Sequence, residues 1–196
     1  MRVIMIRHGQ YDSSFCEEQN INGHGIDLAP LSSNGIAQAK SVAKNPILKD
    51  AQIILSSPLT RAVQTASYVA TETKLDILVE VELREWQPDL TYQKATKSNV
   101  HIAYEDYLAH DGVYPKNEEK NWETSKMVFG RAYNCLKNYN DKYSKIIVIA
   151  HGELMRQFKS TELMPYCGII EFEFNEISLE EWCTKEAGVR ERNKKR

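Results

Sequence analysis

The sequence predicts an α/β fold, a three-layer sandwich in which a largely parallel sheet has helices on both faces and carries a small cap insertion. Short apolar runs of strand length recur along the chain, for example at residues 2–6, 52–56 and 146–150. Helical patterns alternate with these runs, which is typical of a parallel sheet covered on both faces. One long segment, residues 86–125, interrupts this alternation and is interpreted as the cap.

The elements follow in order from local signals. Residues 2–6 are the first buried strand, and the polar residues 10–30, which contain several turn formers, are expected to be a loop. Ser32 or Ser33 can cap a helix that runs to about Asn45. The later predicted elements are a strand at 52–56, a helix at 60–71, strands at 77–79 and 146–150, a short helix after Gly152, and a half-exposed strand at 169–174.

The chain is expected to form one domain over residues 1–189, because nothing outside the cap breaks the strand and helix pattern. Residues 86–125 hold several tyrosine and tryptophan residues among many charges. Residues 190–196 form a charged tail, which we expect to be solvated.

Composition excludes several classes of function. The 196 residues carry a formal net charge of −2, so nucleic-acid binding has no compositional support. No signal peptide and no run of roughly 20 apolar residues is present, so we expect a cytoplasmic protein without a membrane partner.

The four cysteines are widely spaced and are expected to be free thiols. The five histidines show no metal-type spacing, and the sequence does not require a metal.

Four side chains share one structural context. Arg7, His8 and His151 come directly after buried strands, and Arg61 lies in the first turn of the helix that follows another strand. The carboxyl ends of parallel strands meet at one edge of a sheet, so these side chains should form a cationic pocket there. Guanidinium groups match the oxygens of a phosphoryl group, which is the ligand we expect.

The two histidines suggest the chemistry of this pocket. Neighbouring cations disfavour the imidazolium form, so they should keep a histidine neutral and nucleophilic near pH 7. A neutral His8 can attack phosphorus while the arginines and His151 stabilise charge on the oxygens. The alkoxide that leaves needs a proton, and Glu80, Glu82 and Glu85, which follow the third strand, are candidate acids.

Four motifs occur in one order along most of the chain. They are Arg7-His8-Gly9, the stretch S-S-P-L-T-R-A-V-Q-T-A at residues 56–66, Leu83-Arg84-Glu85, and Ala150-His151-Gly152. With these motifs, and with residues 27–39 leading into the first helix, the chain resembles the histidine phosphatase superfamily. That group contains cofactor-dependent phosphoglycerate mutases and broad-specificity phosphatases. A single R-H-G would be weak, whereas four motifs in sequence are specific.

The resemblance implies roles for single residues. His8 would be the nucleophile, and Arg7, Arg61 and His151 would complete the phosphate pocket. The family's acid, in an L-x-E context, falls on Glu85, although Glu82 is close enough to compete. Gln10 stands where family members often place a polar residue that contacts substrate, and an ordinary loop role is almost as plausible for it. No metal and no organic cofactor is implied.

The chain also departs from the family pattern. Tyr11 and Ser14 stand where many members have a serine or threonine and an asparagine. After Glu85 the sequence is W-Q-P-D at residues 86–89, which is neither the glycine-rich continuation of many phosphatases nor the Asn-Glu-Arg context of the mutases. These departures leave the phosphoryl centre intact and leave the natural substrate open.

We therefore expect a phosphomonoester hydrolase that works through a phosphohistidine on a small phosphorylated metabolite. The first alternative is a phosphoglycerate mutase-type phosphotransferase, which must protect its phosphoenzyme from water. The second is a catalytically silent module that binds a phospho-ligand or a protein. This module would require the loss of a pocket residue, and no such loss is evident. The sequence gives no oligomeric state.

Overall fold

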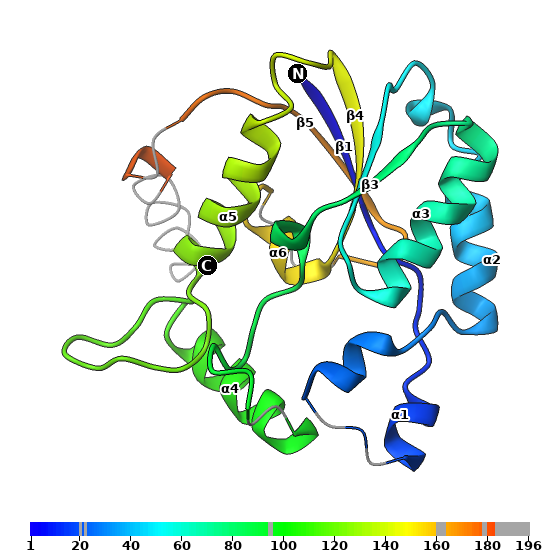
Figure 1. Ribbon diagram of the computed structural model, residues 1–196. Coiled ribbons are helices and arrows are strands. Elements are labelled where there is room, and N and C mark those ends of the chain that lie inside the picture. The colour runs from blue at the N-terminus through cyan, green and yellow to red at the C-terminus, as the bar shows by residue number, and fades with distance from the viewer. Residues whose placement is uncertain (20, 22, 94–95, 160–163, 178–179, 183–196) are drawn as a thin grey trace, which may run out of the picture.

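A computed structural model of the chain describes residues 1–19, 21, 23–93, 96–159, 164–177 and 180–182. Within these residues a five-stranded sheet has the order β3-β2-β4-β1-β5 (Figure 1). Its strands are β1 (Arg2–Arg7), β2 (Ile54–Ser56), β3 (Ile77–Val79), β4 (Lys145–Ala150) and β5 (Ile169–Glu173). The first four are parallel, and β5 pairs with β1 in the antiparallel direction. The sheet is mostly parallel, as the sequence predicts.

Helices cover both faces of the sheet. The α-helices are α1 (Ser14–Glu18), α2 (Ser33–Val42), α3 (Thr60–Thr73), α4 (Lys97–Ala109), α5 (Ser125–Lys137) and α6 (Gly152–Arg156), and the 3-10 turns are η1 (Gly23–Leu28), η2 (Pro46–Leu48) and η3 (Val81–Leu83). On one face, α2 and α3 pack with Ile4 and Ile147 of the central strands. On the other face, α5 and α6 pack with Met5 and Val148. The α/β sandwich is therefore confirmed, and alternate residues of each central strand supply the two cores.

The strand register brings the ends of three strands together. Arg7 lies opposite Ala150 where β1 and β4 end, and Ser56 lies opposite Ile149 where β2 ends. The residues that follow these ends therefore meet at one edge of the sheet. Figure 1 shows α1 and α4 on this same side, beyond the carboxyl ends of the strands.

Several elements differ from expectation. Residues 10–30, expected to be a loop, contain α1 and η1, and α2 ends at Val42 rather than near Asn45. After Val42 the chain leaves the helix and enters η2, which is capped by Asn45. The Asn45 side chain accepts a hydrogen bond from the backbone of Ile47 at 3.0 Å. The expected strand at 52–56 is shorter than predicted, since β2 begins at Ile54.

Helix α5 was not predicted at all, although its sequence carries the signals of a helix. Its buried side chains include Val128, Ala132, Cys135 and Leu136, which recur at helical spacing. The side chain of Thr124 accepts a hydrogen bond from the backbone of Met127 at 3.2 Å and caps the first turn.

The remaining expectations concern the cap, the tail and the membrane. Residues 86–125 contain α4, and their role as a cap stays a prediction. The charged tail at residues 190–196 lies outside the described residues. In the part of the chain that is described, no helix combines the length and the apolar character needed to cross a membrane.

Candidate active site

His8 lies directly after β1 with a buried side chain. Its Nδ1 is 2.7 Å from the carbonyl oxygen of Gly9, and its Nε2 is 3.3 Å from Nε of Arg61. A carbonyl oxygen can only accept a hydrogen bond, so the ring proton belongs on Nδ1. Nε2 is therefore unprotonated, and its electron pair accepts a hydrogen bond from Nε of Arg61.

Gly9 allows the chain to pass very close to helix α2. A Cβ atom on Gly9 would lie only 2.6 Å from the carbonyl oxygen of Gly35. The backbone nitrogen of Gly9 donates a hydrogen bond to Oγ1 of Thr65 at 3.1 Å, which links the same turn to α3. The glycine after His8 is thus required by the close approach of two backbones.

Two arginines lie beside His8, each next to a tyrosine. The guanidinium carbon of Arg61 is 5.2 Å from the ring centroid of Tyr11, and that of Arg7 is 4.2 Å from the ring centroid of Tyr166. The two tyrosine rings lie 6.0 Å and 5.7 Å from the His8 ring. Cation–π contacts of this kind hold the guanidinium groups in place.

The arginines also have polar partners. Nη1 of Arg61 is 3.7 Å from Oδ1 of Asp27, and Nη1 of Arg7 donates a hydrogen bond to the carbonyl oxygen of Met164. Both arginines are therefore oriented by the protein itself, a condition for electrostatic stabilisation without reorganisation.

His151 follows β4 and faces His8. The ring centroids of the two histidines are 5.0 Å apart, and Nε2 of His151 is 2.6 Å from the hydroxyl oxygen of Ser57. His151 is fully buried. Within the described residues, its Nδ1 and the Nε of Arg7 are buried side-chain nitrogens that have no hydrogen-bond partner.

Both histidines are neutral at pH 7. The pKa of His8 is lowered to about 3, first by burial and then by the charges of Arg61 and Arg7, against a raising effect of the Gly9 carbonyl. The pKa of His151 lies well below its ordinary value, again first because of burial and then because of Arg61. Burial is thus a larger cause than the cationic neighbours from which the sequence predicts neutral histidines.

The three candidate acids occupy different surroundings. Glu82 is exposed and pairs with Arg84 at 2.9 Å, and Glu80 accepts a hydrogen bond from the hydroxyl group of Tyr139. Of the three, Glu85 is the one that contacts the turn after His151. Its carboxyl group accepts hydrogen bonds from the backbone nitrogens of Leu154 at 3.2 Å and Glu153 at 3.3 Å.

The Glu85 carboxyl group is suited to hold a proton. Burial is the main cause that raises its pKa, and the charge of Glu153 adds to it. The backbone N–H of Trp86, 2.9 Å from Oε1, acts in the opposite direction, as does the charge of Arg61. A carboxyl group with a raised pKa can act as a general acid near neutral pH.

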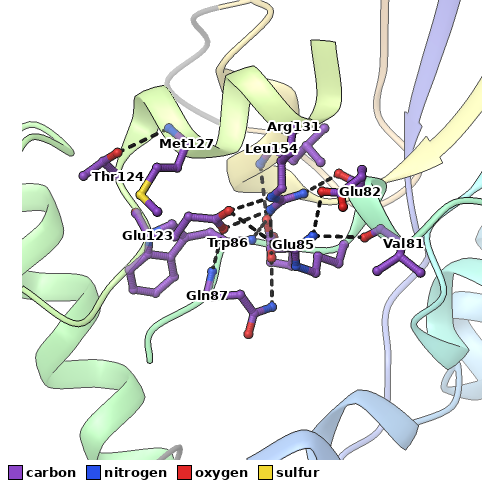
Figure 2. Close-up of polar contacts among 11 residues, drawn as sticks. Val81, Glu82, Glu85, Trp86, Gln87, Glu123, Thr124, Met127, Arg131 and Leu154 are labelled. Atoms are coloured by element: carbon purple, nitrogen blue, oxygen red, sulfur yellow. Dashed lines mark hydrogen bonds and ion pairs between the residues drawn. The ribbon is translucent and has the colours of Figure 1, made fainter. Parts of the chain in front are cut away.

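A buried ion pair holds the segment that carries Glu85 (Figure 2). Nε of Arg131 lies 2.6 Å from Oε1 of Glu123, and Nη2 lies 3.0 Å from Oε2. The same guanidinium donates hydrogen bonds to the carbonyl oxygens of Glu82 and of Glu85, the latter at 3.1 Å. The Glu123 carboxylate accepts a further hydrogen bond from the backbone of Gln87 at 3.2 Å. The backbone on both sides of the acid is therefore fixed to α5.

Gln10 is held at the start of helix α2. Its side-chain oxygen accepts hydrogen bonds from Nδ2 of Asn34 at 2.8 Å and from the hydroxyl group of Ser32 at 3.3 Å. The expected substrate contact of Gln10 stays a prediction, since this oxygen is already engaged in fixing the loop after His8.

Sequence reasoning missed the groups that orient the pocket. Ser57 could have been found, because it follows a buried strand just as the histidines do. Tyr11 was noted only as a departure from the family pattern. Asp27 and Tyr166 lie in segments with no signal that relates them to His8.

The described residues contain no group of three or more histidine, cysteine, aspartate or glutamate side chains that could hold a metal ion. The two guanidinium groups of the pocket are cationic, so they suit an anionic ligand.

The chain is similar in sequence to named bacterial proteins. The chain is 28% identical over 170 residues to the probable phosphoglycerate mutase GpmB of Proteus mirabilis (strain HI4320), covering 83% of this chain and 75% of the relative. It is 27% identical over 210 aligned positions to the uncharacterized phosphatase PhoE of Bacillus subtilis (strain 168), covering 95% of this chain and 94% of the relative.

The fold also matches solved structures. A mycobacterial glucosyl-3-phosphoglycerate phosphatase in complex with VO3 aligns with a TM-score of 0.66 at 21% identity, over 92% of this chain and 94% of that chain. At this identity the likeness supports the fold alone. Residues 3–192 match the family description "Histidine phosphatase superfamily (branch 1)". The chain therefore belongs to the histidine phosphatase superfamily.

Proposed function

We propose that the chain is a phosphomonoester hydrolase that acts through a phosphohistidine at His8 on a small phosphorylated metabolite. The observation that carries the proposal is the state of His8. Its ring is neutral, its proton points to the Gly9 carbonyl, and its Nε2 lies beside Arg61 at 3.3 Å. This arrangement presents an electron pair to phosphorus in a cationic pocket.

In the first step, Nε2 of His8 forms a bond to phosphorus while the bond from phosphorus to the ester oxygen breaks. The leaving alkoxide takes the proton of Glu85, so a neutral alcohol departs. The phosphorylated ring carries a positive charge with its proton on Nδ1, and the Gly9 carbonyl, 2.7 Å away, stabilises that charge.

In the second step, the Glu85 carboxylate takes a proton from water. The resulting hydroxyl oxygen bonds to phosphorus, the bond to Nε2 breaks, and inorganic phosphate and neutral His8 result. Glu85 is protonated again, so the cycle closes without a cofactor.

The phosphoryl oxygens would be bound by Arg7, Arg61 and His151. Among the described residues, Nε of Arg7 and Nδ1 of His151 are buried without a hydrogen-bond partner. Buried polar atoms are normally paired, and phosphoryl oxygens would supply acceptors for N–H groups at both positions.

The relatives support a hydrolase but also give a reason to keep the mutase alternative. The Bacillus relative is named a phosphatase, whereas the Proteus relative is named a probable phosphoglycerate mutase. The sequence W-Q-P-D after Glu85 lacks the Asn-Glu-Arg context of the mutases, and this difference counts against the mutase alternative.

Two assays test the proposal. Release of inorganic phosphate is measured across a panel of sugar phosphates, nucleotides, phosphoglycerates and phosphopeptides, with His8→Ala as the control. Interconversion of 2- and 3-phosphoglycerate is measured separately. Phosphate release that His8→Ala abolishes is the expected result. Interconversion faster than release would favour the mutase, and phosphate binding without turnover would favour a silent module.

A further inference from the structure

Glu153 is a buried carboxylate that takes no part in the two proposed chemical steps. It lies in α6, two residues after His151, and its side chain is about one-tenth exposed. Four groups donate hydrogen bonds to it, namely the hydroxyls of Tyr104 (3.1 Å) and Tyr107 (2.8 Å), Nη1 of Arg156 (3.1 Å) and Nε2 of Gln157 (3.2 Å). A carboxylate with four donors, one of them a guanidinium, keeps its negative charge.

Glu153 also touches the candidate acid. Its backbone nitrogen donates a hydrogen bond to Oε2 of Glu85 at 3.3 Å. The negative charge of the Glu153 side chain also raises the pKa of Glu85, because two like charges at one turn of the chain are unfavourable. Glu153 has a cationic partner, whereas the hydrogen bonds to Glu85 come from backbone nitrogens. The proton therefore belongs on Glu85.

We propose that Glu153 is a positioning residue whose fixed negative charge keeps the proton on Glu85 and which links helix α4, bound by its side chain, to that acid, bound by its backbone nitrogen. The inference rests on the proposed function, because it assigns Glu85 as the general acid. Tyr104 and Tyr107 both belong to α4, so the same carboxylate links the segment expected to be a cap with the turn after His151.

Other groups near Glu85 also affect its charge. The charged ones are Arg61 of α3, Arg131 of α5 with its partner Glu123, Arg84 and Glu82 of the same segment, and Arg156 of α6. His151, after β4, is titratable but neutral at pH 7. Burial and Glu153 raise the pKa of Glu85, while Arg61 and the backbone N–H groups of Trp86 and Glu153 lower it. Removal of the Glu153 charge must therefore lower that pKa.

The test is the pH dependence of kcat/KM for Glu153→Gln, which keeps the shape of the side chain and removes the charge. The alkaline limb reports the general acid of the free enzyme. For an alkyl phosphate we expect this limb to move to lower pH. The value of kcat/KM should fall roughly tenfold at pH values above the limb and should change little at pH values below it. Nitrophenyl phosphate should change much less, because its leaving group needs little protonation.

Controls separate this role from a merely structural one. Glu82→Gln, which removes an exposed carboxylate on the same segment, should leave the limb in place. Tyr104→Phe removes the hydrogen bonds of one hydroxyl group, to Glu153 and from Arg156, but no charge, so it should not move the limb to lower pH. If Glu153→Gln does not fold, Glu153→Met removes the same charge, and the same shift is expected.

If Glu153→Gln loses activity equally at every pH, or if its alkaline limb does not move, the proposed role of Glu153 is wrong. Phosphatase activity of the wild type would still support the proposed function in that case. Absence of wild-type turnover on every phosphomonoester would overturn the proposed function together with this inference.

Discussion

The position of single protons decides what the pocket can do. His8 is neutral because its ring is buried beside two arginines, and its proton lies on the nitrogen that faces the Gly9 carbonyl. Glu85, by contrast, is held in surroundings that favour its protonated form. Burial thus favours the neutral form of both side chains, deprotonated for His8 and protonated for Glu85, since it disfavours the charged form of each.

Substitutions of Glu85 and Glu82 test which glutamate is the general acid. General acid catalysis contributes about 10²–10⁴-fold, so Glu85→Gln should slow hydrolysis of alkyl phosphates by roughly that factor. Hydrolysis of nitrophenyl phosphate should fall much less. Glu82→Gln should have a far smaller effect, because Glu82 is exposed and pairs with Arg84. A leaving-group-dependent loss in Glu82→Gln, with Glu85→Gln near wild type, would show that the acid is misassigned.

At the residue scale the sequence predicts which side chains form the pocket, but not which residues orient them. Arg7, His8, Arg61 and His151 could be placed together because each follows a strand that reads as buried. Ser57 contacts His151, Tyr166 contacts Arg7, and Glu153 contacts Glu85. Each contact joins segments far apart in the chain, and no local pattern encodes such contacts. Burial as the main cause of the low histidine pKa values likewise emerges only when the strands are packed.

At the scale of elements, helix α5 fixes the segment that carries the acid. Arg131 and Glu123 form a buried pair that also binds the backbone of Glu82, Glu85 and Gln87 (Figure 2). Breaking a buried pair leaves one charge uncompensated, which costs about 3–5 kcal/mol.

Arg131→Ala should therefore lower the free energy of unfolding by about 3–5 kcal/mol. It should also lower kcat on alkyl phosphates, because the backbone on both sides of Glu85 loses its anchor. Denaturant titration and steady-state kinetics measure the two effects. Lys126→Ala, at an exposed position of the same helix, is the matched control and should change neither. Unfolding free energies that agree for the two variants would contradict the anchoring role.

The elements differ in how far the sequence reveals them. β1 and β4 are continuous apolar runs, which are typical of strands buried on both faces, so both were predicted. The antiparallel direction of β5 depends on the path of the chain after α6, and local patterns do not encode it. Helix α4 packs on the core through Ala103, Tyr104 and Tyr107, two of them tyrosines that also bind Glu153, so its sequence lacks the aliphatic periodicity that predicts a helix.

For the whole molecule, the buried neutral histidines make stability depend on pH. His8 has a pKa of about 3 in the folded state and about 6.5 when unfolded. Below about pH 6.5 the unfolded chain binds a proton that the folded chain does not. The stability contributed by neutral His8 is therefore complete above that pH and is lost as the pH falls toward 3.

Urea titrations between about pH 7.5 and 5 should show a declining free energy of unfolding. Each buried histidine should contribute a slope that approaches about 1.4 kcal/mol per pH unit. His8→Asn should reduce the slope by one such contribution. His101→Gln should keep the wild-type slope, because the His101 side chain is 72% exposed. The same slope in His8→Asn as in the wild type would show that His8 is not buried in the neutral form.

The central claim for the whole molecule is that phosphate passes from substrate to water through His8. Rapid quenching of the enzyme with a labelled phosphomonoester, followed by mapping of the labelled peptide, tests it most directly. We expect an acid-labile, base-stable phosphate on His8 that forms faster than free phosphate and is absent from His8→Ala. A label on a serine, cysteine or aspartate, or a label that survives in His8→Ala, would contradict the claim.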